Sequence, residues 1–273
     1  SNRSTDFISP SFGYGCLYNC LYCYMKRHKK EGLSIAVNTS TILQSINEHC
    51  TWLEYPKIPN QTSDLYYTYD ISCNEDFSLH LKYHNWKEIF NFFKNDDRIM
   101  ASFATKYVNK NLLQYNPNKK IRVRLSLMPE FLRQILEPNT SNIGNRLNFV
   151  NELIEMDYDV HLNFSPVIIH DKWLDNYKFL FEVVDRQVHN KNKDKVKCEV
   201  IFLTHNTKKH IVNLTINSNA ERYLWNPSIQ ENKISQYGGT NLRYKAYLKK
   251  EFINQFKELH NSIIGWNTIR YIF

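Results

Sequence analysis

The sequence has no apolar run that approaches the ~20 residues of a membrane-spanning helix, and its first residues contain no apolar segment typical of a signal peptide. Its six cysteines do not form the pattern of a disulfide framework in a chain of 273 residues. Internal repeats and low-complexity segments are absent. These absences favour a globular protein of a reducing compartment, which we expect to be the cytoplasm, with no membrane partner.

Charge is present but not concentrated. The net charge of +8 would permit binding to nucleic acid, but no block of Lys and Arg stands out along the chain. Hydrophobic residues make up 42% of the sequence, which is enough for a sizeable core. We therefore expect one large domain, or one domain with a small appendage.

Three of the cysteines are clustered between aromatic residues. Cys16, Cys20 and Cys23 follow the spacing C-x3-C-x2-C, and Tyr22 and Tyr24 flank the last of them. Three thiolates this close can hold three irons of a four-iron cluster, which leaves the fourth iron without a protein ligand. S-adenosylmethionine (SAM) can bind an open iron through its amino and carboxylate groups, and its reductive cleavage starts radical chemistry.

A structural zinc site is the alternative for these cysteines. It needs four ligands, and the nearest fourth candidate, His28, gives a spacing that matches no common zinc finger. The cysteine spacing, with an aromatic residue before the last cysteine, instead resembles the signature of radical SAM enzymes.

The pattern over residues 1–203 alternates between strands and helices. We predict strands at 33–37, 65–73, 99–105, 121–127, 160–169 and 197–203, and helices at 41–50, 86–94, 109–115, 142–156 and 173–188. This alternation predicts an α/β protein with a parallel sheet, and about six β/α units would form a partial (β/α)6 TIM-type barrel. Its active site is then expected at the C-terminal ends of the strands.

The pattern changes at residue 204. Residues 204–245 are polar and interrupted, and a helix at 246–260 and a strand at 268–273 follow. We expect 204–273 to be a small C-terminal extension with a hairpin, a helix and a terminal strand, packed on a barrel formed by 1–203.

A further cysteine, Cys73, closes the strand predicted at 65–73. Most radical SAM proteins have a Gly-Gly-Glu type motif at this place, and the chain, with seven glycines in total, has none. A thiol has a weak S–H bond and can give a hydrogen atom to a carbon radical. A buried core cysteine is the alternative, and it is the role that we expect for Cys50 and Cys198. The place of Cys73 at a strand end favours the hydrogen donor.

Segments along nearly the whole chain resemble the spore photoproduct lyase family of radical SAM enzymes. They are the cysteine loop, the lone cysteine after a strand, Ala-Thr-Lys-Tyr at 104–107, Arg-Val-Arg-Leu-Ser at 122–126, Glu-Pro-Asn-Thr-Ser at 137–141 with Arg-Leu at 146–147, Ser-Pro-Val-Ile at 165–168, and the turn at 237–238 with Arg-Tyr at 243–244. The resemblance implies a [4Fe-4S] cluster on the three clustered cysteines and SAM as cofactor. The implied reaction reverses a methylene-bridged thymine dimer in UV-damaged DNA, through hydrogen abstraction by a 5′-deoxyadenosyl radical.

The resemblance also implies roles for single residues and an external electron donor of the flavodoxin or ferredoxin type. Glu75 stands where the family has a serine contact to SAM. The implied residues are Cys73, Tyr22 and Tyr24 for hydrogen transfer, Lys106, Ser126, Glu75 and Arg146 for SAM, and Arg243, Tyr244 and Asp76 for the DNA lesion.

Two departures from the family keep alternatives open. Only fifteen residues precede Cys16, fewer than in the family, so the chain is either trimmed or a shorter member. Asn74 and Glu75 replace Thr and Ser after Cys73. The alternatives are a radical SAM enzyme on the same scaffold with a peptide, RNA or small-molecule substrate, and a metal-cluster module that binds nucleic acid without catalysis.

Overall fold

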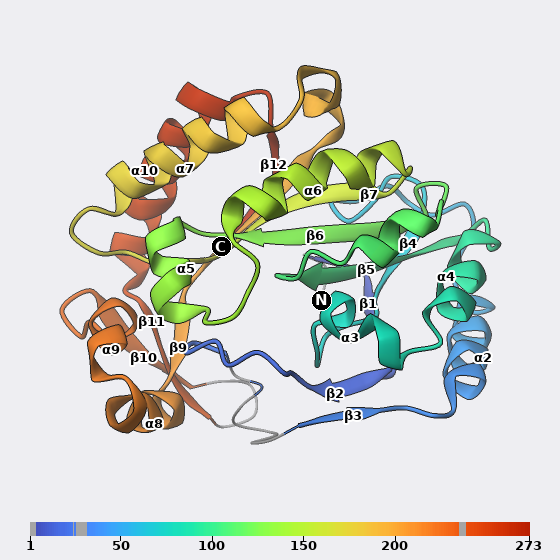
Figure 1. Ribbon diagram of the computed structural model, residues 1–273, viewed down its shortest axis with the longest axis horizontal. Helices are drawn as coiled ribbons and strands as arrows, with labels where there is room; N and C mark the ends of the chain where they lie inside the picture. The colour runs from blue at the N-terminus through green and yellow to red at the C-terminus, as the bar shows by residue number, and fades with distance from the viewer. Residues whose placement is uncertain (1–3, 24, 26–31, 235–238) are drawn as a thin grey trace.

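A curled parallel sheet with helices on its outer side forms the body of the protein (Figure 1). The computed structural model describes residues 4–23, 25, 32–234 and 239–273. The strands are β1 (Phe7–Ile8), β2 (Gly13–Gly15), β3 (Leu33–Ile35), β4 (Tyr67–Asp70), β5 (Ile99–Thr105), β6 (Ile121–Leu127), β7 (Asp159–Val167), β8 (Lys197–Phe202), β9 (Thr204–Asn206), β10 (Gln230–Ile234), β11 (Thr240–Tyr244) and β12 (Thr268–Ile272). The α-helices are α2 (Thr39–Cys50), α3 (Phe77–His80), α4 (Trp86–Lys94), α5 (Glu130–Leu136), α6 (Ile143–Glu155), α7 (Trp173–Gln187), α8 (Thr207–Ile216), α9 (Ser218–Leu224) and α10 (Ala246–Ile264), and short 3-10 turns lie at Leu81–Tyr83, Lys110–Gln114 and Asn190–Lys195.

The main sheet has the strand order β1-β4-β5-β6-β7-β8-β12, and every pair in it is parallel. Parallel neighbours need a crossover connection, and helices between successive strands supply most of them. The predicted α/β class and partial barrel are therefore confirmed. Within the described ranges we find no helix whose length and hydrophobicity would let it span a bilayer.

The two edges of the sheet differ from the prediction. The stretch at 33–37 forms β3, which pairs antiparallel with β2 outside the main sheet, and β1 takes the edge position instead. With two residues, β1 is too short to leave a periodic pattern in the sequence.

The terminal strand was expected in the C-terminal extension, but β12 pairs parallel with β8 and is the seventh strand of the barrel sheet. Helix α10 packs against α7 and provides the crossover to β12. Residues 204–245, which we call the C-terminal unit, contain the three-stranded sheet β10-β11-β9 with α8 and α9.

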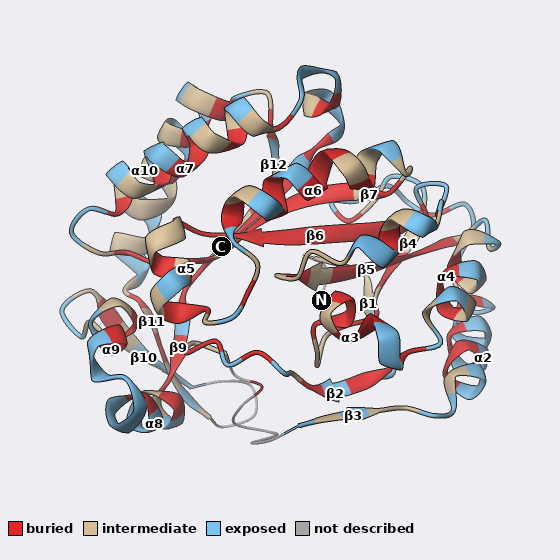
Figure 2. Cartoon of the chain, viewed as in Figure 1, coloured by how far each residue is buried: buried red, intermediate tan, exposed pale blue. Residues whose placement is uncertain are grey.

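Ion pairs between buried charges on the inner face of the sheet show that it is curled. Every residue of β6 is buried (Figure 2), because the apolar residues face the helices and Arg122 and Arg124 face the barrel interior. Arg124 Nη2 lies 2.6 Å from Asp70 Oδ2 on β4, and Nη1 lies 3.6 Å from Glu199 Oε2 on β8. In a flat sheet β4 and β8 would be ~19 Å apart, at ~4.8 Å per strand. One arginine can reach both carboxylates only because the sheet wraps around it.

Candidate active site at the cysteine loop

Hydrogen bonds to the backbone of the cysteine loop hold it from three sides. Gly15 N donates to Asn74 O, which follows β4, at 3.0 Å. Leu21 N donates to Leu136 O at the end of α5 at 2.9 Å, and Leu21 O accepts from Asn213 Nδ2 of α8 at 2.8 Å. Gly15 has φ +106°, which L side chains rarely adopt, so glycine suits the turn from β2 into the loop.

The loop faces a cavity of about 340 Å³. Cys16, Cys20 and Cys23 line it together with Cys73, so the structure brings the four predicted cysteines to one space. Most of the other walls come from strands β4, β5, β7 and β8 or from residues just beyond β4 and β5. These residues are Asp70, Ser72, Glu75, Asp76, Ala104, Lys106, Asn163 and Ile201.

The cysteines suit an iron–sulfur cluster. Burial, with a contribution from Asp76, raises the pKa of the Cys16 thiol to about 12, and burial also raises the pKa of Cys20 well above its usual value. A thiolate in such a place needs a nearby cation, and cluster irons would supply it. Within the described part of the chain, no histidine lines the cavity, and three clustered thiolates would leave the fourth iron of such a cluster without a protein ligand. His28 lies outside the described residues.

Glu75 is held as a carboxylate with one oxygen unused. His80 Nδ1 and His84 Nε2 each lie 2.9 Å from Glu75 Oε2, whereas the buried Oε1 has no partner among the described residues. Burial raises the pKa of Glu75, but the two histidines lower it more, so the net pKa is below its usual value. Gly13 lies so close that an added Cβ would be 2.4 Å from this carboxylate. The site therefore offers a buried negative charge beside the cysteines.

Lys106 and Tyr22 meet at Glu137, which the sequence analysis did not assign to the site. The Tyr22 hydroxyl donates to Glu137 Oε1, and Lys106 Nζ lies 3.9 Å from the same oxygen. Burial lowers the pKa of Lys106, but the charges of Glu137 and Cys20 raise it more, and the net pKa is above its usual value. The cavity thus has a protonated lysine on one wall and the Glu75 carboxylate on another.

Arg146 and Ser126, predicted to bind SAM, are not among the residues that line the cavity. Arg146 is fully buried and donates to Ser126 O, Ser141 O, Thr140 Oγ1 and Glu137 Oε2. These bonds fix the position of Glu137. Arg146 therefore supports Tyr22 and Lys106 indirectly, through Glu137. The Ser126 hydroxyl accepts from the amide of Asn163, which does line the cavity, at 3.4 Å.

Asp76, predicted to contact the lesion, shapes the cavity wall. Its Oδ1 accepts from Thr105 Oγ1 at 2.6 Å and from Leu79 N at 3.0 Å, and its Oδ2 accepts from Lys106 N at 2.9 Å. These bonds begin α3 at Asp76 and orient the backbone of Lys106.

The residues predicted to meet DNA on the hairpin are placed differently from each other. Tyr244 is 1% exposed, and its hydroxyl accepts from Ile169 N at 2.9 Å, so its ring belongs to the core and cannot act as a wedge. Arg243 is partly exposed and pairs with Glu231 across the hairpin at 2.9 Å. The turn at 237–238 and Tyr24 lie outside the described residues.

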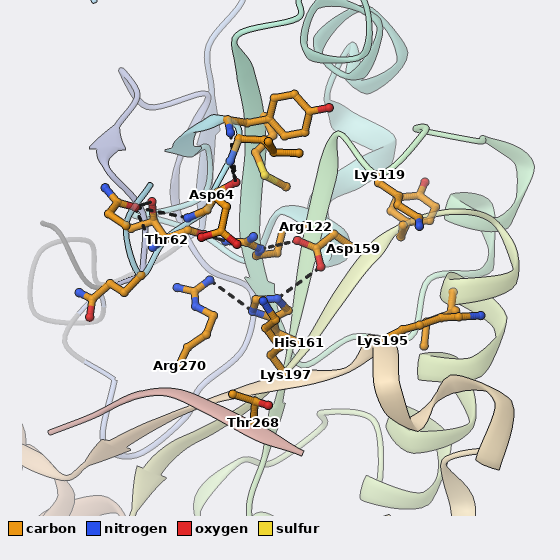
Figure 3. A pocket seen from close by; sticks show the side chains of 18 of the residues that line it. Thr62, Asp64, Lys119, Arg122, Asp159, His161, Lys195, Lys197, Thr268 and Arg270 are labelled. Carbon is orange, nitrogen blue, oxygen red and sulfur yellow. Dashed lines mark hydrogen bonds and ion pairs between the residues drawn. The ribbon is translucent and has the colours of Figure 1, made fainter. Parts of the chain in front are cut away.

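A larger cavity, of about 590 Å³, lies at the opposite, N-terminal ends of the strands (Figure 3). Its central polar groups contact one another: Arg122 pairs with Asp159 at 2.6 Å, His161 lies 3.3 Å from Asp159, and Arg270 donates to His161 Nδ1 at 3.3 Å. None of the predicted site residues lies here. This end of a barrel usually serves stability, and its ion pairs agree with that role.

The sequence analysis missed four residues of the site. His80 and His84 are spaced i, i+4 and follow Glu75 by five and nine residues, a signal that could have linked them to it. Glu137 belongs to the Glu-Pro-Asn-Thr-Ser segment, where the resemblance was noted without a role. Asn163 lies inside a buried strand and left no signal, although its Oδ1 has no partner among the described residues.

Comparison with known proteins supports the family that the motifs indicated. The profile of the family described as "Spore photoproduct lyase" matches residues 1–273. The chain is 25% identical over 205 residues to the spore photoproduct lyase of Bacillus subtilis (strain 168), which covers 74% of this chain and 57% of that protein. It is 24% identical over 205 residues to that of Geobacillus sp. (strain Y412MC61), again 57% of the relative, and 23% identical to that of Clostridium acetobutylicum, 80% of the relative. The matched part is thus little more than half the length of the first two.

Solved structures share the fold. A spore photoproduct lyase complexed with dinucleoside spore photoproduct superposes with a TM-score of 0.86 at 20% identity, covering 100% of this chain and 78% of that chain. A mutant of a spore photoproduct lyase with bound AdoMet and the same lesion gives a TM-score of 0.84 at 19% identity, covering 97% and 76%.

Proposed function

The chain belongs to the spore photoproduct lyase family, and we propose that it is a radical SAM lyase that reverses the methylene-bridged thymine dimer in UV-damaged DNA. The observation that carries the proposal is the shared cavity, where Cys73 faces the same space as Cys16, Cys20 and Cys23. The proposed site of radical formation and a thiol that could quench a radical would thus share one cavity.

The residues of the cavity suit SAM. Three thiolates would hold a [4Fe-4S] cluster with one open iron. When bound, the reduced cluster would supply the electron that cleaves SAM, and the resulting 5′-deoxyadenosyl radical would take a hydrogen atom from C6 of the lesion. The unpartnered Oε1 of Glu75 would accept from the SAM ammonium group, and Lys106 would face its carboxylate. Opposite charges on two walls would therefore orient the amino-acid end of SAM.

Cys73 would finish the reaction. Once the methylene bridge breaks, a thymine methyl radical remains, and the Cys73 S–H bond would give it a hydrogen atom, leaving a thiyl radical. Tyr22 and Tyr24 would return a hydrogen atom toward the Cys73 thiyl radical and receive one from 5′-deoxyadenosine. The 5′-deoxyadenosyl radical would then rejoin methionine to re-form SAM, and the electron would return to the cluster. The bond from Tyr22 to Glu137 would keep its hydroxyl oriented within the cavity wall.

The DNA contact would be made from the hairpin side. Arg243 is the hairpin residue that we retain for phosphate contact, because Tyr244 is buried. The lesion would have to leave the helix stack to reach the cavity. We further propose a cytoplasmic, reducing setting and an external flavodoxin- or ferredoxin-type electron donor, since the cluster needs both.

The test is an anaerobic turnover assay. The chain is loaded with iron and sulfide and given SAM, reductant and dinucleoside spore photoproduct, and restored thymines and 5′-deoxyadenosine are measured. Cys73→Ala should still cleave SAM but should yield adducts in place of restored thymines, whereas the core variant Cys50→Ala should behave like the parent. Cleavage of SAM without repair by the parent chain would refute the lyase and favour another radical substrate.

A further inference from the structure

A second cluster of ligand-type side chains lies in the C-terminal unit, away from the cysteine cavity. His205 comes from β9, His210 from α8 and Glu221 from α9, and one potential ligand atom of each lies within 4.8 Å of the others. His205 is fully buried and Glu221 is 3% exposed. Three separate elements thus converge on one buried point.

Among the residues that the structure describes, Glu221 lacks the Lys or Arg partner that several other carboxylates with buried side chains have. Asp6 pairs with Lys57, Glu137 with Arg146, and Glu199 with Arg124 and Arg270. Within the described ranges, Glu221 makes ion-pair contacts only with the two histidines. A buried carboxylate without a strong cation is costly, and a metal ion would supply that charge.

Glu75 also has a buried carboxylate that contacts two histidines, but the tautomer of one of its histidines differs from the one that a metal site needs. His80 Nε2 accepts a hydrogen bond from Leu17 N at 3.3 Å, so the proton of a neutral His80 is on Nδ1, the nitrogen that faces Glu75. That nitrogen has no lone pair left for a metal. His205 Nδ1, by contrast, has no partner in the described part of the chain, so the proton can sit there and leave Nε2 open toward Glu221.

Both oxygens of the Glu221 carboxylate have partners. Its Oε1 accepts from the Asn213 amide and lies 3.3 Å from His205 Nε2, and its Oε2 lies 3.2 Å from the same His205 nitrogen and 2.5 Å from His210 Nδ1. A carboxylate that is oriented by an amide and faces two imidazoles is a typical arrangement around a metal. Trp225 stacks on His210 at 3.7 Å between ring centroids and fixes the plane of that ring.

We propose that His205, His210 and Glu221 form a second metal site, independent of the cysteine cluster, that binds one Zn²⁺. Two imidazoles and one carboxylate oxygen are zinc ligands, and water would complete a tetrahedral site. Asn213 connects the site to the cysteine loop, because the amide that orients Glu221 also donates to Leu21 O. The metal would thereby hold the C-terminal unit against the segment between Cys20 and Cys23.

The test separates this site from the cluster by using the full chain with Cys16, Cys20 and Cys23 all replaced by Ala. The protein is dialysed against Zn²⁺, and bound zinc is counted by elemental analysis. Tight binding of one ion per chain is expected, together with the visible absorption of tetrahedral Co²⁺ after exchange. His210→Ala, which changes a partly exposed ligand, should weaken zinc binding by ~100-fold or more, because even loss of an outer hydrogen-bond partner costs 10–100-fold.

The matched control is His189→Ala, which removes an exposed histidine outside the cluster and should leave the stoichiometry at one. Zinc should also raise the melting temperature of the parent and the control but not of His210→Ala. Failure of the cysteine-free chain to hold zinc would overturn the proposal. So would equal binding by His210→Ala and Glu221→Gln, because the zinc would then sit elsewhere.

Discussion

The exchange Glu75→Gln tests how the cavity would receive SAM. Glutamine keeps the length of the side chain and removes its charge. His80 and His84 both donate to Oε2, so the amide oxygen of glutamine must take that place and the NH2 group must take the place of the unpartnered Oε1. A donor would then face the SAM ammonium group where the parent chain offers an acceptor.

The expected loss follows from the kind of bond removed. A hydrogen bond to a charged group contributes about 1.5–3 kcal/mol, and each 1.4 kcal/mol corresponds to about a factor of ten in the dissociation constant. The Kd for SAM should therefore rise about 10- to 100-fold. Burial raises the pKa of Glu75, but the two histidines lower it below its usual value, so the charge that is removed is present at neutral pH.

The assay is equilibrium dialysis of SAM with the cluster-loaded chain, followed by the rate of SAM cleavage at saturating SAM. We expect KM to follow the rise in Kd while kcat changes little, because the contact is made equally in the ground and transition states. Glu231→Gln, on the partly exposed hairpin, removes the same charge outside the cavity and should leave Kd unchanged. A Kd for Glu75→Gln within twofold of the parent would refute the ammonium contact.

Four further predictions follow from the same contacts. Gly13→Ala should also weaken SAM binding, measured by the same dialysis, because its Cβ would displace the Glu75 carboxylate. Cys73→Ala should leave SAM cleavage within about twofold of the parent and abolish restored thymines in product analysis. Tyr22→Phe should consume SAM with each repair event instead of re-forming it, which the ratio of 5′-deoxyadenosine to product would reveal. Burial raises the pKa of Glu199, but its partners lower it more, to about 2 from 4.5. The stabilisation that its carboxylate provides is therefore full above pH 4.5 and is lost as the pH falls toward 2. Between neutral pH and pH 3.5, the free energy of unfolding measured with urea should fall by about 1.4 kcal/mol more for the parent than for Glu199→Gln.

Much of the barrel could be predicted because its strands are long enough to show their pattern. The strand at 121–127 was located to the residue, since its alternation is regular over seven positions. The two-residue β1 could not be found in this way, and β12 was found as a strand but assigned to the extension. Pairing between β8 and β12 depends on how α10 packs on α7, which no local pattern encodes.

The site was predictable where its chemistry depends on residue type and spacing. The three clustered cysteines were singled out because a cluster would need thiolates at short intervals, and the structure places them around one cavity. Tyr244 was misplaced because an aromatic residue on a hairpin has the same sequence signal whether its ring turns outward or, as here, toward Ile169 and the core. Glu137 was missed because its partners Tyr22 and Arg146 are 115 and 9 residues away, and only the fold brings them together.

Glu75 and Glu221, the two buried glutamates that each contact two histidines, show that the sequence also does not reveal which histidine nitrogen carries the proton. Each has two imidazoles within hydrogen-bonding distance of a carboxylate, so their composition gives them the same chemistry. The difference comes from one backbone N–H: Leu17 donates to His80 and fixes its tautomer, while His205 Nδ1 has no such donor among the described residues. Under our proposals, Glu75 would accept the ammonium group of SAM, and Glu221 would share a metal ion. Because Leu17 lies beside Cys16, the loop that would hold the cluster would also set the proton on His80, and thereby prepare Glu75 for the proposed contact with SAM.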